Sequence, residues 1–160
     1  MAASHGHLNV VQCLGKELGA DVNKTDSRSY APLSIAAHEG HLDVIRYLCK
    51  ELGADVDTAD GDDVTAFSMS AAQYGHLAVV RCLAKELGAD VNKADDDGVT
   101  SLYIAAQEGH LGVVRCLGRE FGADVNTTDD NGHTPLYTRQ PKTVLALRLT
   151  STRDIYRCQL

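Results

Sequence analysis

Histidine and cysteine are two residue types of this 160-residue chain that could do chemistry, as metal ligands or, for cysteine, as a nucleophile. Four of the seven histidines stand in one recurring phrase, Gly-His-Leu, at His7, His41, His76 and His110. Steps of 34, 35 and 34 residues mark them as one position of a repeat. Equivalent atoms of stacked repeats lie too far apart to share an ion that is bound at about 2 Å. His38-Glu39-Gly40-His41 is also one residue short of the zinc-binding His-Glu-x-x-His helix. We therefore expect loop hydrogen bonds and no metal site.

The cysteines predict buried thiols rather than disulfides. The five are Cys13, Cys49, Cys82, Cys116 and Cys158. Cys13, Cys82 and Cys116 occupy one repeat position, which Tyr47 fills in the unit between. Adjacent helices pack about 8–10 Å apart, whereas a disulfide needs Cα atoms within about 7 Å. An odd number of cysteines also favours a reducing compartment, so we expect five free thiols and a cytoplasmic location.

No other pattern indicates catalysis. The chain has neither a Gly-x-Ser-x-Gly nucleophile motif nor a phosphate-binding Walker loop. A net charge of −7 argues against nucleic-acid binding, which needs clustered Lys and Arg. No run approaches the roughly 20 apolar residues that span a bilayer. We expect a non-enzymatic protein with no cofactor, no nucleic-acid partner and no membrane segment.

Three phrases repeat in a fixed order along the chain. Gly-His-Leu is followed by Leu-Gly-Ala-Asp-Val-Asn, as at 18–23 and 87–92, and then by variants of Thr-Pro-Leu, as at 134–136. Leu42, Val44, Ile45, Leu48 and Leu52 recur at helical spacing, and Gly53 ends that stripe. Each unit therefore reads as helix, loop, helix and turn. One such helix pair cannot bury its apolar face alone, whereas a stack of pairs can.

These phrases resemble the ankyrin repeat family. The resemblance rests on residues 129–136 (Asp-Asp-Asn-Gly-His-Thr-Pro-Leu), 105–111 and 88–92. It implies an all-α fold, an α-solenoid of stacked ankyrin repeats with a projecting β-hairpin finger in each unit. We expect the array over residues 1–137: a partial repeat 1–23, full repeats 24–57, 58–92 and 93–126, and a partial repeat 127–137.

Three departures from the family pattern carry structural expectations. The family period is about 33 residues, and one extra residue precedes each Gly-Ala-Asp here, which predicts a longer second helix. A further residue between Phe67 and Ala71 predicts a bulged or shifted first helix in the third unit. Ser29 and Asp63 replace the turn glycine found at Gly98 and Gly132, so those two fingers should adopt another turn geometry.

Both ends of the array are abrupt. Residues 1–6 are expected to begin inside a first helix, which suggests either a fragment of a longer array or a natural start after a lost exon. Residues 138–160 form a non-repeat basic tail: from 139 onward five basic residues face one acidic residue, a net of +4. Read from the third base of the Tyr137 codon, the code permits His-Ala-Ala-Ala-Gln-Asn-Gly directly after Leu136, a continuing repeat. The tail is therefore either a frameshifted repeat or a C-terminal cap.

The resemblance also implies a binding role, because family members usually bind partners across the fingertips and the exposed side of the first helices. We expect a monomeric scaffold for a protein partner; a regulatory fragment of a larger enzyme and a partnerless spacer remain alternatives. Tyrosines are the expected anchors, and the finger aspartates predict a partner with a basic rim. Mapped by repeat position, the candidate residues are Ser27, Arg28, Tyr30, His38, Glu39, Asp62, Val64, Gln73, Tyr74, Asp96, Asp97, Val99, Tyr103, Gln107, Glu108, Asn131 and His133.

Overall fold

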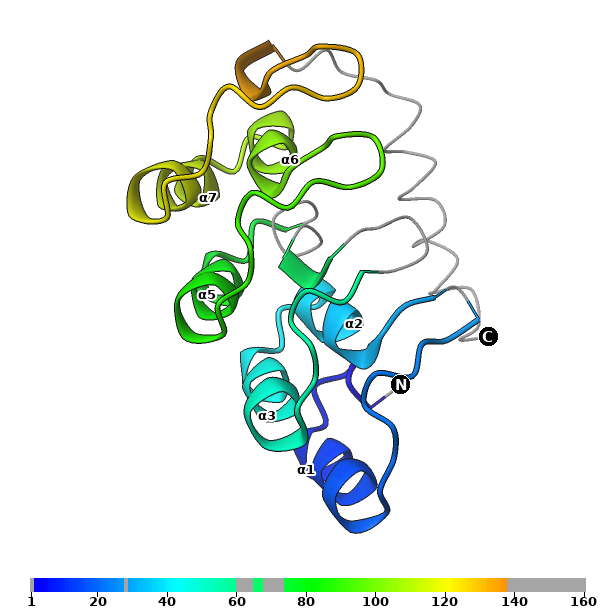
Figure 1. Cartoon of the computed structure of the whole chain (residues 1–160). Coiled ribbons are helices and arrows are strands. Elements are labelled where there is room, and N and C mark those ends of the chain that lie inside the picture. Colours follow the sequence, from blue (N-terminus) through cyan, green and yellow to red (C-terminus); the bar gives the residue numbers. More distant parts are fainter. Residues whose placement is uncertain (1, 28, 60–64, 68–73, 138–160) are drawn as a thin grey trace, which may run out of the picture.

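A computed structural model describes residues 2–27, 29–59, 65–67 and 74–137. The helices stack in two rows, as Figure 1 shows. One row holds the second helices of successive units, and the other holds the first helices. The second helices are α1 (Leu8–Gln12), α3 (Leu42–Leu52), α5 (Leu77–Arg81) and α7 (Leu111–Arg115). The first helices are α2 (Pro32–His38) and α6 (Ser101–Gln107), followed by a 3-10 turn at Pro135–Tyr137.

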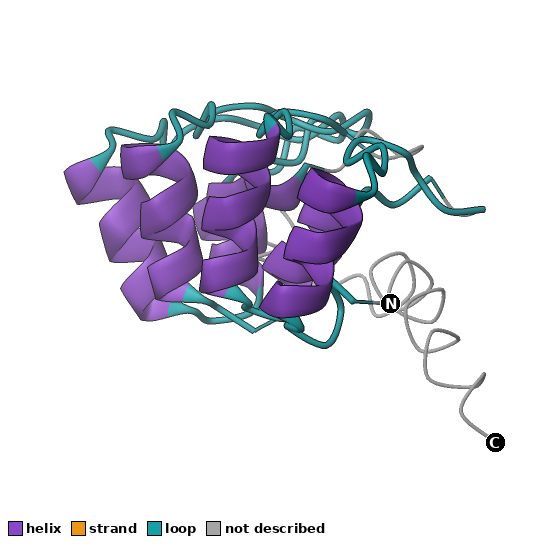
Figure 2. Cartoon of the chain, turned by 90° about the horizontal axis from the view of Figure 1, so that it is seen from below, coloured by secondary structure: helices purple, strands orange, loops and turns teal. Residues whose placement is uncertain are grey.

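The loops between units project together from one edge of the stack (Figure 2). The described residues contain no strand, only isolated bridges between Ala59 and Thr65 and between Ala94 and Thr100. The predicted all-α solenoid of helix pairs is therefore confirmed. The tail 138–160 and the third-unit insertion after Phe67 lie outside the described residues.

Small and branched aliphatic side chains form the core between the two rows. Ile45, Val80 and Leu83 of the second helices are fully buried. Ala36 and Ala105 of the first helices are also fully buried, and their small size lets neighbouring helices approach closely. The core extends through every described unit, which is how a solenoid stabilises helices too short to fold alone.

The extra residue of each second helix enters as a wide π turn in three units. These turns are η1 (Cys13–Glu17), η2 (Cys82–Glu86) and η3 (Cys116–Glu120). In η1 the N–H of Leu18 donates to the carbonyl of Cys13 at 3.0 Å, five residues back. A π turn absorbs one residue without rotating the side chains that flank it. Among the described second helices, only α3 accommodates the insertion as a continuous α-helix, which ends at Gly53 with a φ of +71°.

Ser29 adopts the same turn as the glycines that it replaces. Its φ is +65°, beside +75° at Gly98 and +78° at Gly132. Its N–H donates to the carbonyl of Asp26 at 3.0 Å, as the N–H of Gly98 does to Asp95. The expectation of another turn geometry was wrong at Ser29, because the finger's backbone hydrogen bonds impose this geometry on a serine. Asp63 lies outside the described residues.

The loop histidines connect each unit to the one before it. The Nε2 atom of His41 hydrogen-bonds the carbonyl oxygen of Ser4 at 3.1 Å, and Nε2 of His76 bonds that of His38 at 3.1 Å. The expected loop hydrogen bonding is therefore confirmed for His41 and His76. Nε2 of His110 is buried and meets no hydrogen-bond partner within the described part of the chain.

Ion pairs join the second helices across units. Arg46 of α3 pairs with Glu86 at 2.6 Å, and Lys50 pairs with the same carboxylate at 3.1 Å. Hydrogen bonds from Arg46 and then Lys50 lower the pKa of Glu86 to about 2. Arg81 and Glu120 repeat the pair one unit further on. These bridges hold neighbouring second helices in a fixed register.

The four described cysteines, Cys13, Cys49, Cys82 and Cys116, are free thiols. The prediction of unbonded thiols is confirmed for these four, and Cys158 lies outside the described residues. Burial, followed by the neighbouring Cys82 and Asp55, raises the pKa of Cys49 to about 11. Burial also raises the pKa of Cys82 and Cys116. Buried thiols with raised pKa values are structural rather than reactive.

Candidate protein-binding surface

Two described fingers, residues 95–99 and 129–133, share one hydrogen-bonded construction. The carboxylate of Asp95 accepts the N–H groups of Asp97 and Val99 at 3.0 and 2.9 Å. Asp129 does the same for the N–H groups two and four residues further on, at 3.0 and 2.8 Å. The N–H of Asp130 donates to the carbonyl of Asp97 at 3.0 Å, which ties the two fingers side by side. The fingertips are thus rigid loops at one edge of the stack (Figure 1).

Three exposed carboxylates lie on these adjoining tips, at Asp96, Asp97 and Asp130. The hydrogen bond between the two fingers keeps them close together. The Debye length at physiological salt is about 8 Å, so charges on neighbouring fingertips reinforce one another. This acidic edge suits an approaching cationic surface, and its effect falls as salt increases.

The carboxylate of Asp129 contacts one side chain of the fourth unit and one of the fifth. The Tyr103 hydroxyl donates to Asp129 Oδ2 at 3.3 Å, and Nδ1 of His133 lies 3.2 Å from the same oxygen. Burial alone would raise the pKa of Asp129, but hydrogen bonds from His133 and Asn131 outweigh it, so the pKa is lowered. Burial, with Asp129 nearby, raises the pKa of Tyr103. This cluster is structural support beneath the fingers.

An aromatic cluster joins the end of α2 to the Gly-His-Leu loop of the third unit. The His38 ring meets Tyr74 edge-on, with ring centroids 5.7 Å apart, and Tyr74 lies 5.4 Å from the ring of His76. Nδ1 of His38 is 3.0 Å from the carboxylate of Glu39. Tyr74 keeps 51% of its surface exposed. A half-exposed tyrosine held by two histidines is the kind of aromatic group that dominates interface energetics.

The candidate residues differ in how far they are exposed to solvent. Those on the surface are Ser27, Tyr74, Asp96, Asp97, Glu108 and Asn131. Those that are half-buried are Glu39, Val99, Gln107 and His133. Arg28, Asp62, Val64 and Gln73 lie outside the described residues. The exposed members come from fingers and from the ends of first helices, on successive units of the stack.

Three candidates are buried and need correction. Tyr30 is 8% exposed, and Tyr103 and His38 are 5% exposed. Tyr103 packs beneath the next finger, where Asp129 receives its hydroxyl. Burial removes Tyr30 and Tyr103 from the expected surface anchors and leaves Tyr74. Sequence reasoning missed His76 as a support for Tyr74, although the Gly-His-Leu phrase that carries it was recognised.

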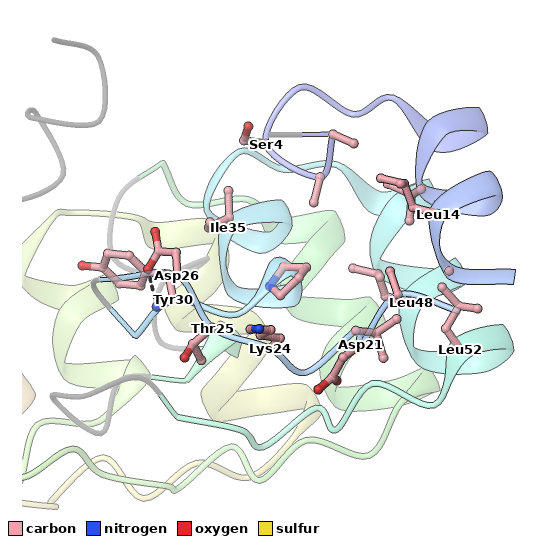
Figure 3. Close-up of a pocket in the computed structure, with 17 residues that line it drawn as sticks. Ser4, Leu14, Asp21, Lys24, Thr25, Asp26, Tyr30, Ile35, Leu48 and Leu52 are labelled. Carbon is pink, nitrogen blue, oxygen red and sulfur yellow. Dashed lines mark hydrogen bonds between the residues drawn. The ribbon is translucent and has the colours of Figure 1, made fainter. Parts of the chain in front are cut away.

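A separate apolar cavity of about 430 Å³ opens at the other end of the stack. Leu14 of η1 and Ile35, Leu48 and Leu52 of the second unit line it (Figure 3). Its polar residues include Ser4, Asp21, Lys24 and Asp26. The Ser4 hydroxyl lies 3.0 Å from Nδ1 of the adjacent His5, which is exposed. Leucine, isoleucine and valine side chains make up much of the remaining lining, so the cavity resembles an unfilled part of the core.

Neither a metal cluster nor a membrane helix is found in the described parts of the chain. No three or more His, Cys, Asp or Glu side chains there gather in a way that could hold a metal ion. Among those same residues, no helix has the length and apolar character needed to cross a bilayer.

Stacked helix pairs with fingers along one edge define a helical repeat protein. The family model "Ankyrin repeats (3 copies)" matches residues 1–95 and 68–138. The chain therefore belongs to the ankyrin repeat family. Ankyrin repeats are generally protein–protein interaction modules, and the family is typically non-enzymatic. A search of curated proteins found no match to this chain.

Proposed function

We propose that this protein is a scaffold or adaptor that binds a protein partner across its fingertips and the exposed ends of its first helices. The observation that carries the proposal is the exposed ring of Tyr74, held between His38 and His76. A side chain already fixed by its neighbours loses little conformational entropy when a partner covers it. Tyr74 is therefore the central anchor of the surface.

The partner presents a basic rim around an apolar patch. Asp96, Asp97 and Asp130 supply the complementary charge on two linked fingertips. Exposed charges of this kind accelerate association and select among partners more than they add affinity. We place the interaction in the cytoplasm, a location supported by the free thiols of the described cysteines, which a reducing compartment preserves.

The first experiment locates the contact. A photo-crosslinking amino acid replaces Tyr74, and in a control it replaces Lys85, an exposed residue of the second helices. A protein crosslinked from Tyr74 and not from Lys85 is then purified as the probe for binding measurements. Crosslinks from Lys85 alone would place the site on the second helices, and crosslinks from neither would favour a spacer.

The second experiment distinguishes the contribution of Tyr74 to affinity from the contribution of the fingertip aspartates to the association rate. With that probe, Tyr74→Ala should weaken binding by about 2 kcal/mol, the magnitude typical of an aromatic hot spot. The double variant Asp96→Asn/Asp97→Asn should mainly slow association, and the difference from wild type should shrink at high salt. Glu17→Gln/Glu51→Gln removes two charges from the second helices and serves as the control. Equal association rates for both double variants at low salt would refute steering by the fingertips.

A further inference from the structure

Asn131 is the one asparagine of the sequence that a glycine follows. In an Asn-Gly pair the glycine carries no Cβ, so nothing hinders its backbone nitrogen from attacking the asparagine side chain. The other four asparagines are followed by valine, lysine or threonine, whose side chains crowd that nitrogen. The sequence therefore holds a single asparagine that is disposed to lose its side-chain amide spontaneously, and it stands in the finger 129–133.

Hydrogen bonds restrain the reacting atoms while the finger is folded. The N–H of Gly132, which carries the attacking nitrogen, donates to the carbonyl oxygen of Asp129 at 2.9 Å. The N–H groups of Asn131 and His133 donate to Oδ1 of Asp129 at 3.0 and 2.8 Å. Because the Gly132 nitrogen must give up its proton before it can attack, the reaction needs a local opening of the finger. The finger therefore slows the loss of the amide and sets its rate.

The product of that loss is already present one unit earlier. Residues 129–132 differ from residues 95–98 only at Asn131, where the earlier finger has Asp97. The N–H of Asp97 donates to Oδ1 of Asp95 at 3.0 Å, and the N–H of Gly98 donates to the carbonyl of Asp95 at 3.0 Å. The φ angles of the two turn glycines are +75° and +78°. An aspartate at position 131 therefore fits this finger with its backbone unchanged.

We propose that Asn131 is a site of spontaneous deamidation whose rate is controlled by the opening of its finger. The backbone nitrogen of Gly132 bonds to Cγ of Asn131, and the side-chain amide leaves as ammonia with the proton of that nitrogen. The resulting five-membered succinimide then takes up one water molecule. Cleavage of the bond between the nitrogen and Cγ gives aspartate, and cleavage of the original peptide bond gives isoaspartate.

The two products have opposite effects on the finger. Aspartate adds one negative charge beside Asp130, on the tip that already adjoins Asp96 and Asp97. Isoaspartate adds a methylene to the backbone and displaces the N–H groups that Asp129 binds. The extra charge would increase the attraction for a basic partner, a consequence that rests on the proposed function. The reaction itself does not depend on any partner.

The test is peptide mass spectrometry of the full chain, stored folded at a mildly alkaline pH. Trypsin releases residues 120–139 as one peptide, which contains both Asn126 and Asn131. Fragmentation of this peptide locates the change from amide to acid and distinguishes aspartate from isoaspartate. Asn131 should convert progressively, whereas Asn126, which precedes the β-branched Thr127, should stay intact in the same molecules.

Two variants test the control by the finger. Asp129→Ala removes the carboxylate that binds two N–H groups of this finger, so it should speed the conversion of Asn131 several-fold. Asp124→Ala removes the equivalent bond to the N–H of Asn126 and should leave the rate at Asn131 unchanged. Urea-denatured wild type gives the rate without any finger, and it should exceed that of both folded proteins.

The outcomes that overturn the proposal are distinct. An Asn131 that stays intact in the folded chain while the denatured chain converts completely would show that the finger is no deamidation site. Equal rates for wild type, Asp129→Ala and the denatured chain would refute control by the finger. Asn131→Asp should melt at the same temperature as wild type, and a clearly lower melting temperature would refute the fit of the product.

Discussion

Replacing Ser29 by glycine should stabilise the protein, because this serine holds a left-handed conformation. Its φ of +65° matches the turn glycines of other fingers. A left-handed backbone costs an L-residue about 1–2 kcal/mol. Glycine removes that cost but loses about 0.5–1 kcal/mol more conformational entropy on folding. The net gain for Ser29→Gly is therefore about 0.5–1 kcal/mol, or roughly 1–4 °C in melting temperature for a domain of this size.

The reverse change in a later finger provides the matched control. Gly98→Ser puts a Cβ at 3.1 Å from Oδ1 of Asp130 and 3.2 Å from its backbone nitrogen. Crowding adds to the conformational cost, so this variant should lose about 1–2 kcal/mol. Thermal and urea unfolding monitored by circular dichroism measure both variants. A Ser29→Gly protein no more stable than wild type, beside a Gly98→Ser protein that is not destabilised, would refute the argument from backbone strain.

Three further measurements probe other features. Cys49 should react with a thiol reagent at pH 8 about 100-fold more slowly than a thiol of pKa 9, because its own pKa is about 11, and denaturant should abolish the difference. Glu86→Gln should lower the melting temperature at pH 7, because the folded state depresses the pKa of this carboxyl group to about 2. The ionised carboxylate therefore contributes its full stability above the unfolded pKa of about 4.3, and this contribution is lost as the pH falls towards about 2. The melting temperatures of wild type and variant should converge at that pH. His76→Ala should cost about 1–2 kcal/mol, because it leaves the carbonyl of His38 without its partner. His7→Ala, for which the described residues show no such bond, should change stability much less.

The repeat phrases predicted the fold because a period shared by three motifs leaves few arrangements open. They could not predict how the extra residue in each second helix is absorbed. The repeat period shows that the extra residue is present. Packing against the next unit decides whether the helix accommodates it as a π turn, as at Cys82–Glu86, or as a continuous α-helix, as in α3. Ser29 shows the same limit. Its sequence disfavours the left-handed turn, and the hydrogen bond to Asp26 imposes it.

The expected exposure of the candidate residues was wrong at Tyr30, Tyr103 and His38, which are buried. Repeat position alone places Tyr30 and Tyr103 on the expected surface, and it does not give the contacts of an individual side chain. Tyr103 is instead covered by a finger whose Asp129 lies 26 residues later in the chain. Contacts of that range are not visible in a single repeat. Tyr74 kept its expected exposure.

The histidine bonds between units give the stack a direction. His41 secures the unit before it, and His76 does the same for its own predecessor, so the first and second units are held from their C-terminal sides. Among the described residues nothing secures the unit that ends at Gly109 in this way. Local unfolding should therefore begin at this end of the stack and spread towards the N-terminus. Amide hydrogen exchange should be fastest around residues 101–137 and should become slower towards α3.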